Sequence, residues 1–322
     1  MNILRLTLNP LQKLLRDRDP ESWHDITRCQ YVGSEGNGFV RQAIEHSTGK
    51  GLCVAKMGTV ELRNLVAFIA ESHTLKCAQE IYYYLRDYQS LFPVDTFAAL
   101  CHNAGFFPLD ITLGNRWSQL CLNDLPEVDI LGSYQRLERR LEKQLKHAVK
   151  IDIHSYLAPY LFEHPWTEAL RGKRVLVVSP FTDSICQQYE RRQLLFDNSE
   201  VLPKFADLLT IKAVQSIAGT QTQYADWFEA LQTMKDKMSS MDYDIALIGC
   251  GAYGMHLAVH AKRMGRIGIH TAGWTQMLFG VYGNRWLNDE PQFKRFINQY
   301  WVRPSAKETP ANAQTIENGC YW

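Results

Sequence analysis

The feature that most constrains the fold is a segment in which an apolar run, a glycine-rich turn, a helical pattern and a second apolar run follow one another directly. The segment reads DIALIGCGAYGMHLAVHAKRMGRIGIH and spans residues 244–270. Two strands joined by a helix on this spacing are typical of a βαβ unit, in which both strands lie parallel in one sheet. The chain therefore has to build a parallel sheet covered by helices.

Apolar runs and helical patterns alternate over most of the chain, which predicts an α/β fold: a Rossmann-like, mostly parallel sheet flanked by helices. We expect a helix-rich middle segment at residues 75–150, with helices at 75–88, 94–105 and 134–148. Residues 1–30 are expected to form an N-terminal segment with a helical pattern, and residues 31–322 one domain. The strands are expected within residues 51–58, 173–180, 207–216, 243–249 and 266–271, and the other helices within 39–47, 60–72, 183–196, 224–241 and 253–265.

The composition is that of an ordinary globular protein, with 46% hydrophobic and 21% charged residues. Lysine plus arginine number 35 and aspartate plus glutamate 34, a balance that gives no reason to expect nucleic acid as a partner. The eight cysteines include no CxxC pair, which argues against a zinc cage or a thioredoxin-type site. With no secretory signal at the start, they are expected to be reduced thiols in a cytoplasmic protein.

The N-terminal segment alternates leucines with basic residues. No apolar run approaches the roughly 20 residues that a membrane-spanning helix needs. Two interpretations of the segment stay open: it contacts the membrane surface or a partner protein, or it packs on its own domain or forms a loose tail. The leucines stand at helical spacing at Leu4, Leu8, Leu11 and Leu15.

The glycine turn at Gly249, Gly251 and Gly254 has the spacing of a dinucleotide-binding fingerprint. Such a site needs an acidic residue about 20 positions later, yet no carboxylate occurs between Asp244 and Asp289. We therefore expect no binding of NAD or NADP. Either the turn brings the backbone and a helix N-terminus to an anion, or the glycines only permit tight strand–helix packing.

The stretch HTAGWTQMLFGVYGNRW, residues 270–286, continues from that unit with several glycines among aromatic residues. Arg285 offers a planar, multi-donor group that is suited to a phosphate, although a surface ion pair explains it equally well. Gln276 is a candidate for contact with a base or a sugar hydroxyl. His256 and His260 have a spacing that zinc can use, but helix packing is the favoured interpretation.

Taken together, these motifs resemble the GT-D family of bacterial glycosyltransferases. The resemblance covers residues 31–322 and is carried mainly by residues 242–286. Further matching motifs, in the same order along the chain, are KMGTVEL, LRGKRVLVVSPFTDSICQQYERRQLLF, LPKFADLLTIKAVQSIAG and ENGCYW.

The resemblance implies a Rossmann-like domain that transfers a sugar from a nucleotide-sugar donor, often UDP-linked, to a glycan or glycoconjugate acceptor. The expected setting is synthesis of bacterial surface polysaccharide or glycoprotein, in the cytoplasm or at the inner face of the membrane. The alternative is a non-catalytic nucleotide- or sugar-binding protein of the same fold.

The family also implies a Mn²⁺ or Mg²⁺ ion at an Asp-x-Glu motif after the first strand. This chain has Gly58 and then Thr59-Val60-Glu61, so Glu61 matches the glutamate while Thr59 replaces the aspartate. Hard divalent ions prefer carboxylate oxygens, and the replacement leaves metal use undecided. Glu61 also suits a second role, as a carboxylate that complements a helix dipole.

Expected donor-binding residues are therefore Gly58, Thr59, Gly251, Gly254, Gln276 and Arg285. An inverting transferase needs a carboxylate that deprotonates the acceptor hydroxyl. Glu61 and Asp183 are the candidates for this catalytic role. Asp183 follows the strand at 173–180 and is equally well explained as a helix-capping residue.

Overall fold

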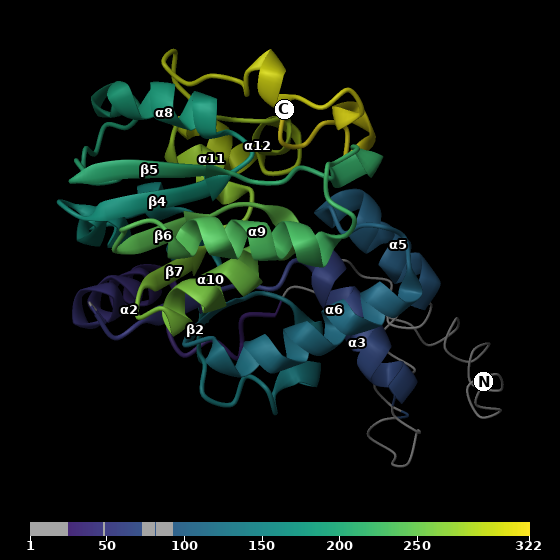
Figure 1. The fold of residues 1–322 in the computed structure, drawn as a ribbon. Coiled ribbons are helices and arrows are strands. Elements are labelled where there is room, and N and C mark those ends of the chain that lie inside the picture. Colours follow the sequence, from purple (N-terminus) through teal and green to yellow (C-terminus); the bar gives the residue numbers. More distant parts are fainter. Residues whose placement is uncertain (1–24, 48, 73–80, 82–92) are drawn as a thin grey trace.

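The structure is a computed structural model that describes residues 25–47, 49–72, 81 and 93–322 (Figure 1). These residues form a seven-stranded sheet with the order β3-β2-β1-β7-β6-β4-β5. Every pairing in it is parallel, which confirms the predicted Rossmann-like α/β fold. The strands are β1 (Leu52–Ala55), β2 (Ile130–Ser133), β3 (Val149–Asp152), β4 (Arg174–Ser179), β5 (Asp207–Lys212), β6 (Ile245–Ile248) and β7 (Ile267–His270).

The βαβ unit predicted at residues 244–270 is present as β6, helix α10 (Gly254–Arg263) and β7. All four residues of β6 and of β7 are buried, as expected for strands that helices cover on both faces. A Cβ atom on Gly268 would lie 2.4 Å from the carbonyl oxygen of Ala258. The missing side chain therefore lets α10 pack directly onto β7.

Helices cover both faces of the sheet, and each face has its own hydrophobic core. One face carries α3 (Thr59–Ser72), α5 (Pro93–Ala104), α6 (Ile111–Asp124), α9 (Trp227–Ser239) and α10. The other carries α2 (Gly33–His46), α7 (His154–Leu157), α8 (Thr182–Glu190), α11 (Trp274–Leu278) and α12 (Arg285–Asn288).

The connections divide between β6 and β4, near the β5 edge of the sheet. β4 and β6 are neighbours, but α8, which follows β4, packs on one face and α10, which follows β6, packs on the other. Where adjacent connections leave to opposite faces, a crevice opens beyond the carboxyl ends of the strands. This topology places a ligand-sized space at that edge before any side chain is considered.

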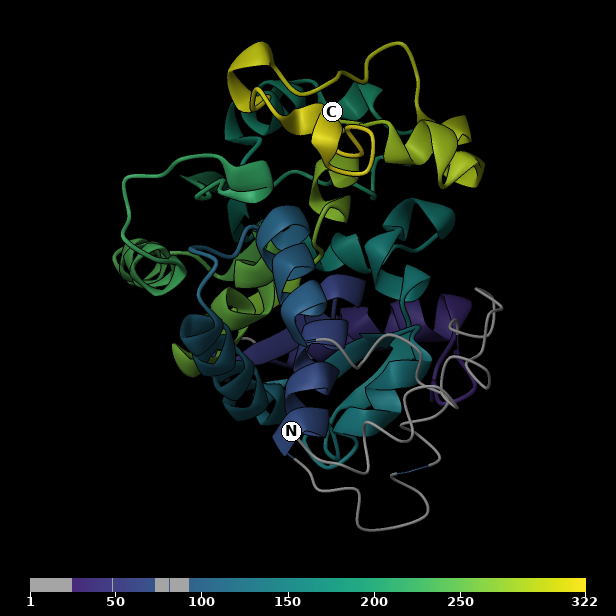
Figure 2. The same ribbon diagram turned by 90° about the vertical axis from the view of Figure 1, so that its right-hand side faces the viewer.

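The C-terminal segment lies beside α8 at that edge, in yellow in both views (Figures 1 and 2). Glu308 fastens it there, because its Oε1 accepts hydrogen bonds from the backbone nitrogens of Asp183 at 2.9 Å and Ser184 at 3.2 Å. The N-terminus of α8 thus receives its carboxylate from a residue more than 100 positions away.

The prediction of a helix at 134–148 is wrong, because the structure has a 3-10 helix at Arg136–Leu141 that is followed by turns. The Glu138 carboxylate accepts hydrogen bonds from the backbone nitrogens of Tyr134 and Gln135, both at 3.2 Å. The Gln135 side chain donates to the carbonyl of Met57 at 3.0 Å. These contacts tie the segment to the turn after β1, and an α-helix does not continue from there.

The rest of the middle segment was predicted only in part. The helix at 94–105 is confirmed as α5, whereas α6 and the short strands β2 and β3 were not predicted. The helix predicted at 75–88 lies, apart from Ile81, outside the described residues, as do residues 1–24 of the N-terminal segment. In the part of the chain that the structure describes, no helix is long and apolar enough to cross a bilayer.

Candidate functional site

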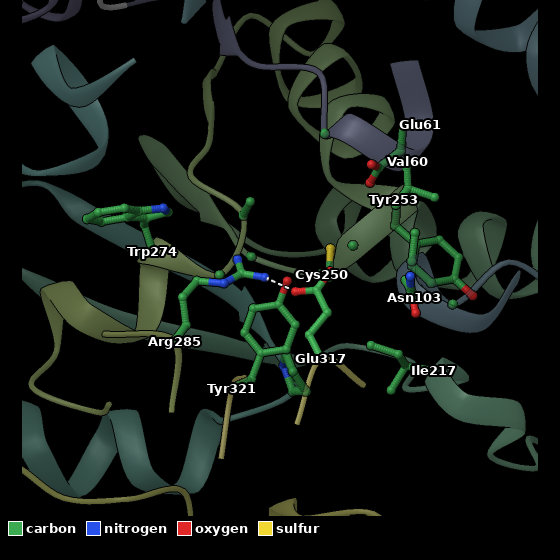
Figure 3. Close-up of a pocket in the computed structure, with 18 of the residues that line it drawn as sticks. Val60, Glu61, Asn103, Ile217, Cys250, Tyr253, Trp274, Arg285, Glu317 and Tyr321 are labelled. Carbon is green, nitrogen blue, oxygen red and sulfur yellow. Dashed lines mark hydrogen bonds and ion pairs between the residues drawn. The ribbon is translucent and has the colours of Figure 1, made fainter. Parts of the chain in front are cut away.

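A cavity of about 460 Å³ lies at the carboxyl edge of the sheet, a size that suits a small-molecule ligand (Figure 3). Its wall is completed by Arg285, Glu290, Glu317 and Tyr321 from the C-terminal part of the chain. Each of the seven strands contributes to it through the segment that follows: Lys56 after β1, Tyr134 after β2, His154 after β3, Phe181 after β4, Ser216 after β5, Gly251 after β6 and Trp274 after β7.

Arg285 lines the cavity, and it also forms an ion pair, the alternative to phosphate binding. Its Nη2 lies 2.5 Å from Oε2 of Glu317, and its guanidinium stacks over the Tyr321 ring at 4.8 Å (Figure 3). Burial raises the pKa of Tyr321 to about 12, so the stacked ring stays a neutral phenol. The guanidinium is thus oriented by two neighbours and still reaches the cavity.

Glu317 reaches Arg285 from an unusual turn. Glu317, Asn318 and Gly319 have φ angles of +44°, +56° and +72°, so two non-glycine residues adopt the left-handed conformation. The turn is held by Asn284, whose Nδ2 donates to the carbonyl of Asn318 at 2.9 Å. Strained backbone of this kind persists where surrounding contacts impose it, and here it presents a carboxylate to the cavity.

Lys56 in the turn after β1 and Glu61 in the first turn of α3 also line the cavity. Lys56 is half-buried; burial lowers its pKa, and the Glu61 carboxylate opposes that shift. A Cβ atom on Gly58 would lie 2.0 Å from Oε2 of Glu61. Gly58 therefore makes room for the carboxylate to fold back over the start of α3, so Glu61 both lines the cavity and sits at a helix N-terminus.

The donor set of this turn does not fit a divalent metal site built by the protein. Thr59 offers a hydroxyl that lies 3.3 Å from the Tyr134 hydroxyl, and Glu61 is the only carboxylate of the Thr59-Val60-Glu61 motif. Among the described residues no group of three or more His, Cys, Asp or Glu side chains could hold a metal ion. Mg²⁺ and Mn²⁺ prefer several oxygen ligands, with carboxylates among them.

The glycine turn after β6 permits tight packing at two positions, and one of these glycines also lines the cavity. Gly251 has φ +56° and lines the cavity, and a Cβ atom on it would lie 2.6 Å from the carbonyl oxygen of Ala104. A Cβ atom on Gly254 would lie 2.2 Å from the ring of His270. Gly254 therefore permits helix packing, whereas Gly251 brings backbone to the ligand space.

Gln276 and Asp183 lie away from the cavity wall. Gln276 is 1% exposed and donates from Nε2 to the carbonyl of Tyr321 at 3.0 Å, which fixes the C-terminal segment. Asp183 is exposed in the first turn of α8. Of the residues singled out from the sequence, the cavity brings together Gly58, Thr59, Glu61, Gly251 and Arg285, and leaves out Gly254, Gln276 and Asp183.

The sequence did not single out several groups that line the cavity. Lys56 stands inside an expected strand pattern, and its only signal was its place in the KMGTVEL motif. Glu317 and Tyr321 belong to the ENGCYW motif, which pointed to the family but to no role. Glu290 has a raised pKa because it is partly buried, and its Oε2 lies 4.0 Å from Nε2 of His154.

A second cluster of ionisable groups is buried between α6 and α10. His256 donates or accepts through Nδ1 at 2.7 Å from Oδ2 of Asp124, and both side chains are 1% exposed. Arg263 Nη1 lies 2.8 Å from the other Asp124 oxygen, and Cys121 Sγ lies 3.6 Å from Nε2 of His256. His256 and His260 thus point to different partners, since His260 contacts Ser239 at 3.0 Å. Helix packing, the favoured interpretation of this pair, matches the geometry.

The comparisons with known proteins agree with this geometry. Residues 128–273 match the family model of the GT-D fold-like domain. The resemblance seen in the sequence motifs is confirmed over this part of the chain, which contains β2 to β7. The searches of curated proteins and of solved structures gave no match. Lys56, Glu61, Arg285 and Glu317 lie outside the matched residues.

Proposed function

We propose that this protein is a glycosyltransferase that binds a nucleotide-sugar in the cavity and moves its sugar to a hydroxyl of a glycan or glycoconjugate. The observation that carries the proposal is the position of Arg285. A guanidinium lines a ligand-sized cavity at the carboxyl edge of a GT-D-like sheet, beside the Gly251 turn. Guanidinium groups bind phosphate through several parallel hydrogen bonds.

The residues that line the cavity suit both the diphosphate and the sugar of such a donor. Lys56 and Arg285 supply positive charge for the diphosphate, and an incoming phosphate would take the place of the Glu317 carboxylate on Arg285. The carboxylates of Glu61 and Glu290 are acceptors for sugar hydroxyls. The family resemblance supports a UDP-linked donor and an acceptor from bacterial surface polysaccharide or glycoprotein synthesis at the cytoplasmic side of the membrane.

Sugar transfer requires stabilisation of the departing diphosphate and a base for the acceptor hydroxyl. The two cations serve the first need. Glu61, Glu290 and Glu317 are carboxylates in the cavity and can serve the second, whereas Asp183 is exposed and does not line it. The raised pKa of Glu290 makes it a stronger base than an ordinary glutamate.

The test is incubation of the purified protein with a panel of nucleotide-sugars, with and without an acceptor glycan. We expect UDP to raise the melting temperature, and UDP to be released from its sugar donor when an acceptor is present. Binding without release would identify a non-catalytic binding protein. If neither the nucleotide-sugars nor the free nucleotides bind, the proposal is wrong.

A further inference from the structure

The turn after β1 places a lysine beside the position where the resembling family holds its metal ion. Lys56 lines the same cavity as Thr59 and Glu61, and it directly follows the last residue of β1. The Glu61 carboxylate is the opposite charge that acts most strongly on the Lys56 ammonium. The turn thus contains a cation with its own counter-charge.

Two like charges, those of Lys56 and Arg285, line this cavity. Arg285 is the positive group that acts most strongly on Lys56, so the two cations repel each other across the ligand space. Bringing like charges together in a partly buried site costs free energy unless an anion lies between them. Glu317 compensates Arg285, and a diphosphate bound between the two cations would compensate both.

The same turn is unfavourable for a divalent cation. Thr59 contributes a hydroxyl instead of a carboxylate, and Glu61 alone cannot hold an ion that requires several oxygen ligands. The Lys56 ammonium cannot ligate a metal, and it would repel a divalent cation bound beside Glu61.

We propose that Lys56 supplies the positive charge that a metal ion supplies in the resembling family, with Glu61 positioning its ammonium, so that this protein transfers sugar without a divalent ion. The inference rests on the proposed function. The bond between the anomeric carbon and the diphosphate oxygen breaks, and its electron pair stays on the diphosphate between Lys56 and Arg285. The acceptor oxygen forms the new bond to the anomeric carbon, and its proton passes to Glu290 or Glu317.

Calorimetric titration of the full chain with UDP, GDP and dTDP tests the inference. Each nucleotide is titrated once in EDTA and once in Mn²⁺. We expect at least one to bind, with the same affinity in both buffers. If binding requires Mn²⁺, this inference fails while the proposed function stands. If none of the three binds in either buffer, both fail.

Variants of Lys56 supply the second arm, measured in EDTA. Lys56→Met keeps the length of the side chain and removes its charge, and it should weaken nucleotide binding roughly 10- to 100-fold, the scale of one lost charge-assisted contact. Lys56→Arg keeps the charge and should restore most of the affinity, which a purely structural role would not require. The control is Lys204→Met, because Lys204 is exposed and outside the cavity wall.

Unchanged affinity in a folded Lys56→Met variant overturns the inference. If that variant does not fold, Lys56→Gln takes its place with the same expected loss. Turnover with the donor identified by titration gives a further readout: Lys56→Met should lower kcat in EDTA, and Mn²⁺ should not rescue it. Rescue of the variant by Mn²⁺ would show that a metal can occupy this turn and would contradict the inference.

Discussion

Two clusters of ionisable side chains contain similar residue types but have different roles. The buried cluster consists of Asp124, His256, Cys121 and Arg263. The cavity cluster consists of Lys56, Glu61, Arg285 and Glu317. In the buried cluster, burial lowers the pKa of His256 and raises that of Cys121 well above its usual range. A neutral imidazole can then donate a hydrogen bond from Nδ1 to Asp124 and accept one from the Cys121 thiol at Nε2, while Arg263 balances the carboxylate.

The cavity cluster differs in access and in charge balance. Its groups line a space large enough for a ligand, and its two cations act on each other across that space. The buried cluster has the chain of contacts of a cysteine–histidine–aspartate triad, but its thiol is protonated and fully enclosed. A reactive site is therefore indicated by charged groups that border a ligand-sized cavity, more than by the residue types that are in contact.

The largest expected effect comes from breaking the buried cluster. Asp124→Asn removes the charge of a carboxylate that is 1% exposed and contacts both His256 and Arg263, and loss of a buried charge-assisted hydrogen bond costs about 1.5–3 kcal/mol. Urea denaturation should show this loss in the free energy of unfolding. Asp242→Asn is the control, because Asp242 pairs with Arg174 and Arg266 at the surface. A cost below about 1 kcal/mol for Asp124→Asn would mean that the cluster is not a stabilising one.

Glu61→Gln tests the cavity cluster, because it removes a charge while nearly keeping the shape. If Glu61 positions Lys56, turnover should fall roughly 100-fold, the scale lost with a main electrostatic stabiliser, while the melting temperature barely changes. If Glu61 only complements the dipole of α3, the change should cost about 0.3–1 kcal/mol of stability and leave turnover unchanged. Glu45→Gln, an exposed change on α2, is the matched control.

Arg285→Ala should weaken UDP binding by about 2–3 kcal/mol, since a charge-assisted phosphate contact is lost. Calorimetric titration measures the loss. Arg171 makes a comparable arginine–glutamate ion pair with Glu200 at the surface, so Arg171→Ala is the control and should bind UDP normally. Normal UDP binding by a folded Arg285→Ala variant would reduce Arg285 to a structural ion-pair partner of Glu317.

The buried cluster should also make stability depend on pH. The lowered pKa of His256 means that the unfolded chain gains a proton below about pH 6.5 that the folded protein does not bind. This contribution to stability is complete above about pH 6.5 and is lost as the pH falls toward the lowered value, with a slope of up to about 1.4 kcal/mol per pH unit. Melting curves from pH 7.5 to 5 should show a smaller decrease for His256→Asn than for the wild type.

Glu317→Gln is expected to have the smallest effect, and the opposite sign. The Glu317 side chain is 48% exposed, so its pair with Arg285 stabilises by only about 0.2–1 kcal/mol. The Glu317 carboxylate competes with a phosphate for the Arg285 guanidinium. Its removal should therefore let UDP bind roughly 1.5- to 5-fold more tightly. Weaker binding in this variant would show that Glu317 contacts the ligand instead of giving way to it.

The sequence predicted the parts of the fold in which helical and strand periods are long and regular. α3, α9, β4 and the βαβ unit of β6, α10 and β7 all followed from such periods. β2 and β3 have four residues each and flank a segment rich in charged residues, so their patterns are too short to stand out. The capping contacts of Glu138 and the long-range contact of Gln135 with Met57 then overrode the helical pattern at 134–148.

The candidate site was predictable where residues follow a recognisable strand, as Glu61, Gly251 and Arg285 show. Lys56 was hidden, because a lysine at the end of an apolar run looks like the solvated end of a strand. Glu317 could not be placed, because it meets Arg285 only through three successive left-handed residues and a segment fastened to α8 by Glu308. Local patterns contain no information about such contacts.

The cavity wall formed by residues 285–321 has a consequence for the order of assembly on the ribosome. All seven strands precede these residues, so the whole sheet is synthesised before Arg285, Glu317 and Tyr321 are added. A nascent chain that stops after β7 would contain every strand of the sheet and the turn with Lys56 and Glu61. It would still lack the charged side chains of Arg285 and Glu317. Competence to bind is thus acquired last, and premature termination in this stretch would leave the site unfinished and would also remove Trp286, Phe293 and Trp301 from the hydrophobic core of one face.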